Sequence, residues 1–167
     1  MFRKLSAATF VAFALAITSV GAIASDFTIK SDNLAPAFNK AAKKLGADNR
    51  MVRGKCQSEV KFVCQYEAGS GVSLLAVADN PKNKDISSIR IVYASKDRAD
   101  VMNFAETVGV LMALLVPAAD KDERGAAMVA LLSRLKDADE GNVDLHDVNF
   151  RIRAAADIGV VTTVTKP

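Results

Sequence analysis

The chain has 167 residues, of which half are hydrophobic and a quarter charged, and this composition excludes a disordered or low-complexity protein. Two of the 22 basic residues and none of the 19 acidic ones lie in the first 24 residues. The net charge is therefore +3 for the whole chain and +1 for residues 25–167. That near-neutral balance predicts no nucleic-acid partner and no general attraction to an anionic membrane surface.

The first 24 residues have the order of a secretory signal peptide. Arg3 and Lys4 precede an apolar stretch over residues 7–17, and a small-residue pattern ending at Ala24 follows it. The apolar stretch is shorter than the ~20 residues that span a bilayer, which favours cleavage over anchoring. Cleavage of 24 from 167 residues leaves 143, which predicts one globular domain over residues 25–167 in a periplasmic or secreted protein without a transmembrane segment.

The mature chain opens with a predicted helix. Leu34, Phe38 and Leu45 recur at helical spacing, Pro36 suits the first helical turn, and Gly46 suits the C-terminal cap.

Cys56 and Cys64 are the only cysteines, and an even pair in an exported chain predicts a disulfide. In one continuous strand they would lie ~26 Å apart, whereas a disulfide needs Cα atoms within ~7 Å. The chain must therefore reverse between them, which predicts a hairpin with arms over residues 55–58 and 62–68 and a turn near residues 59–61. The spacing does not match the CxxC pattern of redox sites, so a structural bond is expected.

Two further strands are predicted after this hairpin. Residues 72–78 are nearly all apolar, as expected of a central strand that is buried on both faces. Residues 86–94 alternate instead, with Ile89, Ile91 and Tyr93 on the side expected to be buried. The short connections predict an antiparallel arrangement.

Two helices come next. Asp97 resembles an N-terminal helix cap, and the helix is predicted to run to Val116, where Pro117 stops it. Its apolar positions begin at Val101, and residues 108–116 are apolar on all sides. Residues 121–135 form an amphipathic pattern with Asp120 as cap and Glu123 as its capping-box partner.

The final segment begins with many acidic residues. Residues 137–147 resemble a calcium-binding loop in composition, but Asn142 and Val148 stand where an EF-hand needs Gly and Glu. A solvated turn is therefore expected. Residues 148–155 and 158–165 then predict two strands.

Arg90, Arg151 and Arg153 each lie on the more polar side of a predicted strand. If those strands are neighbours, the three guanidinium groups form a basic patch that can bind carboxylate or phosphate bidentately. The alternative is a solvent-facing sheet surface with ordinary charges.

Signals for catalysis are weak. His146 is the only histidine, so no two-histidine metal site is expected, and no phosphate-binding loop or other cofactor motif is present in the sequence. Ser70 lacks the G-x-S-x-G context of a hydrolase nucleophile and is typical of a turn. Carboxylate pairs such as Glu67 with Asp79 could meet across strands, but no local pattern marks them.

Taken in order, the chain predicts an α+β domain of helix, four strands, two helices and two strands. We expect an antiparallel sheet of five or six strands with helices packed on one face. The function favoured is a non-catalytic binding, inhibitory or envelope protein whose partner is another protein or an envelope component; the sequence implies no particular oligomeric state. Two alternatives stay open: a lipid carrier in which residues 108–116 line a cavity, and a small hydrolase that uses His146 or paired carboxylates.

Overall fold

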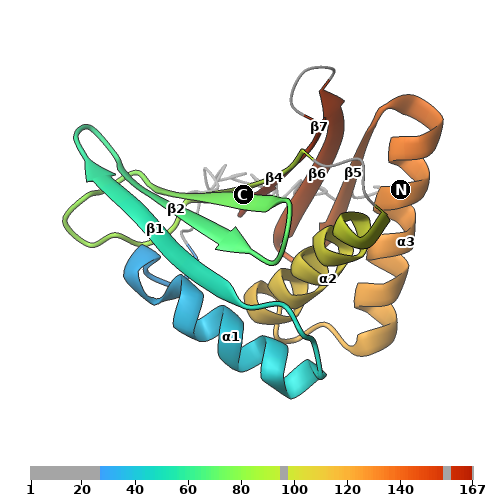
Figure 1. The fold of residues 1–167 in the computed structure, drawn as a ribbon, viewed down its shortest axis with the longest axis horizontal. Helices are drawn as coiled ribbons and strands as arrows, with labels where there is room; N and C mark the ends of the chain where they lie inside the picture. The colour runs from blue at the N-terminus through green and yellow to red at the C-terminus, as the bar shows by residue number, and fades with distance from the viewer. Residues whose placement is uncertain (1–26, 95–97, 156–158, 167) are drawn as a thin grey trace, which may run out of the picture.

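A computed structural model describes residues 27–94, 98–155 and 159–166; the predicted signal peptide lies outside them. Within these residues the chain forms one seven-stranded antiparallel sheet and three α-helices (Figure 1). The elements in chain order are η1 (Ser31–Asn33), α1 (Leu34–Leu45), β1 (Met51–Ser58), β2 (Phe62–Ala68), β3 (Val72–Ala78), β4 (Ser88–Tyr93), α2 (Arg98–Leu115), α3 (Lys121–Ala138), β5 (Glu140–Leu145), β6 (Val148–Ala155) and β7 (Gly159–Thr165).

The strands lie in the order β1-β2-β3-β4-β7-β6-β5, and every neighbouring pair is antiparallel. The last of the described strands, β7, thus lies inside the sheet between β4 and β6 and joins the meander β1–β4 to the hairpin β5–β6. The predicted α+β class and antiparallel pairing are confirmed. The expected count of five or six strands is wrong, because the described residues form seven.

The additional strand is β5, which forms where the sequence predicts a solvated turn. Asp139 ends α3 in the left-handed conformation with φ 57°, and the chain passes directly into β5, which pairs with β6 along its length. Gly141 allows α3 to lie close to β5, since a Cβ there would be 2.7 Å from the Cβ of Arg134. Arg134 also donates a hydrogen bond to the backbone oxygen of Asn142, so α3 contacts β5 through its backbone as well as through packing.

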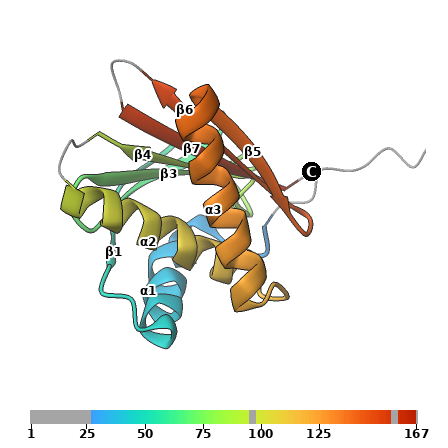
Figure 2. The same ribbon diagram turned by 90° about the vertical axis from the view of Figure 1, so that its right-hand side faces the viewer.

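The two faces of the sheet differ, as Figure 2 shows with all three helices on the same side. On that side Tyr66, Leu74, Ile91 and Phe150 are almost fully buried. Burial alternates along β2, β3, β4 and β6, so the other face is not covered. The predicted alternation of residues 86–94 is confirmed, whereas the expectation that β3 is buried on both faces is wrong.

The helices largely follow the sequence prediction. Gly46 caps α1 with φ 70°, and Asp120 and Glu123 form the predicted capping box at the start of α3. The predicted Asp97 cap of α2 lies outside the described residues. Val101 is 44% exposed, contrary to its predicted place in the apolar stripe. No helix within the described part of the chain is long and apolar enough to cross a membrane.

One side of the apolar half of α2 is buried in the core. Val108, Val110, Leu111 and Met112, together with Val116 directly after the helix, are each at most 2% exposed and belong to the same hydrophobic cluster as the covered face of the sheet. The other side, with Ala113, Leu114 and Leu115, is only partly buried.

The predicted disulfide is present. Cys56 on β1 and Cys64 on β2 are directly paired residues, and the chain reverses over residues 59–61 as expected. The first arm of this hairpin was predicted to start at residue 55, but β1 starts at Met51 and contains an irregularity between Arg53 and Cys56. The disulfide therefore ties the exposed edge strand to the interior of the sheet.

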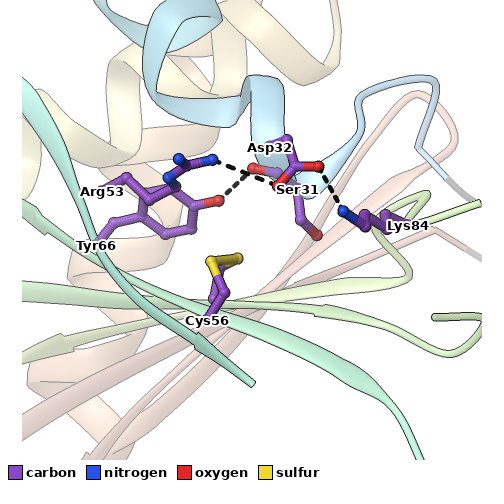
Figure 3. The surroundings of a disulfide bond; sticks show 7 residues. Ser31, Asp32, Arg53, Cys56, Tyr66 and Lys84 are labelled. Atoms are coloured by element: carbon purple, nitrogen blue, oxygen red, sulfur yellow. Dashed lines mark hydrogen bonds and ion pairs between the residues drawn. A yellow bond between two sulfur atoms is a disulfide. The ribbon is translucent and has the colours of Figure 1, made fainter. Parts of the chain in front are cut away.

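A polar cluster lies beside the disulfide (Figure 3). The Tyr66 hydroxyl donates a hydrogen bond to the backbone oxygen of Ser31, and Asp32 forms ion pairs with Arg53 at 3.3 Å and with Lys84 at 2.8 Å. These contacts attach η1 to β1, β2 and the loop before β4.

Candidate functional site

On the uncovered face of the sheet, which we call the open face, side chains from β4, β7 and β6 lie next to one another. Arg90 of β4 and Arg151 of β6 are both paired with Thr163 of β7, one on each side of it. Adjacent strands lie about 4.8 Å apart, so the two arginine backbones are separated by roughly 10 Å across the strands. This distance lets two long side chains converge over the threonine between them.

Arg153 completes the group. It lies two residues beyond Arg151 on the same face of β6 and is paired with Val161 of β7. Arg90, Arg151, Arg153, Val161 and Thr163 line a hollow of about 220 Å³, which we call the basic hollow. The structure thus brings together the three arginines of the sequence prediction. Sequence reasoning missed Val161 and Thr163, because residues 158–165 were predicted as a strand from their β-branched composition and each face of that strand carries both Val and Thr.

The basic hollow is only partly neutralised. Glu140 of β5 forms an ion pair with Arg151 at 3.2 Å, and each of these side chains is 58% exposed. Within the described part of the chain, no salt bridge engages Arg90 or Arg153. Two guanidinium groups therefore keep their charge available for an external anion, and guanidinium geometry suits carboxylate and phosphate oxygens.

Its size limits what the basic hollow can hold. Pockets that enclose a whole small ligand usually measure ~300–1,000 Å³. At about 220 Å³, the basic hollow suits a single anionic group, with the remainder of its ligand outside.

A second hollow adjoins it on the open face. This hollow measures about 320 Å³ and is lined in part by Leu75 and Val92, with Glu67 as its only charged side chain. Leu75 is paired with Arg90, and Val92 is paired with Val161, so the two hollows meet along β4. An anionic group in the basic hollow would have an apolar surface beside it.

The other candidates do not form a site of this kind. His146 lies in the β5–β6 turn, 39% exposed, and its Nε2 is 3.5 Å from a carboxylate oxygen of Glu123. Neither residue lines any of the hollows described above. Among the described residues, no group of three or more His, Cys, Asp or Glu side chains could hold a metal ion.

The carboxylate pair considered from the sequence is not brought together. Glu67 is paired with Ser73 at one end of the β2–β3 hairpin, whereas Asp79 follows β3 at the opposite end. Asp79 instead accepts a hydrogen bond from Lys61, which lowers the pKa of its carboxyl, and the Nζ of Lys61 lies 2.6 Å from it. A lowered pKa keeps Asp79 ionised, which suits a surface ion pair and not a general acid.

Comparison with known proteins adds no further assignment, since no family model, curated protein or solved structure matches the chain.

Proposed function

We propose that this chain is a non-catalytic binding protein of the periplasm or the extracellular space, and that the basic hollow takes an anionic group of its partner. The observation that carries the proposal is the convergence of Arg90, Arg151 and Arg153 around Thr163, with a single carboxylate paired to them among the residues that the structure describes. A phosphate or carboxylate group would accept hydrogen bonds from two or three guanidinium groups there.

The adjoining hollow supports a ligand with an apolar portion. Leu75 and Val92 offer hydrocarbon surface next to the arginines, so a ligand with an anionic end and an apolar body would contact both hollows. Export is supported by the disulfide, because such bonds persist in oxidising compartments.

Phenyl phosphate, benzoate and benzyl alcohol form a probe series for this proposal, since they share an aromatic body and differ in charge. We expect the two anions to bind and to perturb the backbone amides of Val161 and Thr163 in an NMR titration. The neutral alcohol should bind at least tenfold more weakly, because hydrogen bonds to charged groups contribute about 1.5–3 kcal/mol each.

The double variant Arg90→Gln/Arg153→Gln should lose this anion binding. Lys43→Gln is the matched control, because Lys43 is exposed on α1 and removal of its charge leaves the open face unchanged. Equal affinity of the double variant and the unmodified protein, or equal losses in the double variant and the control, would show that the basic hollow is not the binding site.

A further inference from the structure

A separate groove lies on the helical side of the molecule, between α1 and the C-terminal part of α2. Figures 1 and 2 both show these two helices side by side. The groove measures about 410 Å³. Its floor is hydrocarbon, with Ala37 and Ala41 from α1, Ala113 and Leu114 from α2, and Pro117 among its lining residues.

Every charged residue that lines this groove is positive. Lys40 and Lys44 lie one helical turn apart on α1, and Arg124 lies across from them near the start of α3. Arg124 donates a hydrogen bond to the backbone oxygen of Ala119, which holds its side chain near the α2–α3 connection. Within the described residues, no salt bridge neutralises any of the three.

The apolar surface continues beyond the groove. A neighbouring hollow of about 240 Å³ shares Ala37, Leu114 and Pro117 with it and extends the hydrocarbon lining to Phe27 and Ile29. An extended apolar chain could therefore lie across the α1–α2 contact and continue past Ala37.

We infer that this groove binds a single-chain fatty acid anion, with its hydrocarbon chain on the apolar floor and its carboxylate between Lys40, Lys44 and Arg124. The volume lies within the range of pockets for one small ligand. A protein partner would need about 800 Å² of surface on each side for a stable interface, which is more than a groove of this size offers. Residues 1–24 do not complement the positive rim of the groove, which consists of Lys40, Lys44 and Arg124. The only charged residues in that segment are Arg3 and Lys4, and both are also positive.

The fatty acid test is a titration of the purified, oxidised protein with octanoate, decanoate and dodecanoate below their micelle concentrations. Calorimetry should show one site, and affinity should rise by at most about fourfold per methylene group, because full burial of one CH₂ contributes ~0.8 kcal/mol. Dodecyltrimethylammonium and dodecyl maltoside carry an alkyl chain one carbon longer than the tail of dodecanoate and have no negative charge. Both should bind at least tenfold more weakly than dodecanoate.

Charge reversal identifies the rim. Lys40→Glu/Lys44→Glu should weaken dodecanoate binding at least tenfold, whereas Lys43→Glu, on the same helix but outside the groove lining, should leave it unchanged. Arg90→Gln/Arg153→Gln should also leave it unchanged, which separates this groove from the basic hollow. Equal binding of the anionic and cationic chains, or no loss in the charge-reversed variant, would overturn the inference.

Discussion

At the scale of single residues, Tyr66 combines burial with a polar contact. Its side chain is 1% exposed in the core, while its hydroxyl donates to the backbone oxygen of Ser31. Burial raises the pKa of Tyr66 from 10.0 to about 12, because the phenolate would lose its hydration. The interior of this domain therefore contains a group that resists ionisation at high pH.

The first prediction follows from this raised pKa. Because the folded protein holds the Tyr66 proton more tightly than the unfolded chain, the associated stability is complete below pH 10 and is lost as the pH rises toward 12. A shift of this size corresponds to about 2–3 kcal/mol. Urea unfolding between pH 8 and 12 should show a decline of this order that is smaller in Tyr66→Phe.

The same variant has a cost at neutral pH. Tyr66→Phe removes the hydrogen bond to Ser31, so its unfolding free energy should fall by about 1–2 kcal/mol at pH 8. An unchanged pH profile in Tyr66→Phe would show that another group causes the alkaline loss of stability.

At the scale of elements, two glycines on α3 and β5 should respond oppositely to the same substitution. Gly141 lies against the Cβ of Arg134 and the backbone oxygen of Leu131, so Gly141→Ala should push α3 away and cost about 1–3 kcal/mol. Gly125 lies within α3 and has open space around the position of a Cβ. Gly125→Ala should stabilise by about 0.5–1 kcal/mol, because alanine favours the helix.

Thermal or urea unfolding measures the stability of both variants. Opposite changes would show a packing clash at position 141, whereas a general preference for alanine over glycine would change both in the same direction. Similar shifts in both would mean that the close approach of α3 to β5 does not limit the residue at position 141.

The elements with strong periodicity could be predicted from the sequence, and β5 could not. β2 and β3 have the predicted ranges, and both α1 and α3 have the predicted caps. β5 carries Glu140, Asn142 and Asp144 on its exposed side, and such residues favour turns when read locally. Its strand conformation depends on pairing with β6 and packing against α3, and neither contact is visible in the local pattern.

The open face was also only partly predictable. Alternation placed Arg90, Arg151 and Arg153 on the polar sides of their strands, but it did not specify the strand order. β7 lies between β4 and β6, and this non-local pairing puts Thr163 between Arg90 and Arg151. The burial of β3 on one face was misread because half-buried Leu75 and Val77 look like core residues in sequence.

At the scale of the whole molecule, the disulfide stabilises β1, the edge strand whose residues are the most exposed in the sheet. From Val52 to Ser58, β1 is exposed along its length, and the Cys56–Cys64 bond joins it to a buried position of β2. Closure of so short a loop contributes roughly 2–3 kcal/mol in the chain-entropy account.

Cys56→Ala/Cys64→Ala should therefore lower the unfolding free energy by about that amount. Hydrogen exchange should accelerate first in the β1 amides, because the helices cover other parts of the sheet more completely. The β6 and β7 amides serve as the internal control, since they lie beyond β4 and should keep their relative protection. Uniform acceleration across all strands would show that the bond supports the entire fold equally.

The irregularity in β1 also limits how copies of this protein can associate through that edge. Between Arg53 and Cys56 the regular pairing of β1 with β2 is interrupted, and at the start of β1 the side chain of Asn39 binds both the backbone N–H and the backbone oxygen of Met51. A strand added along β1 would need a regular row of free N–H and C=O groups, and interruptions of this kind protect edge strands against such addition.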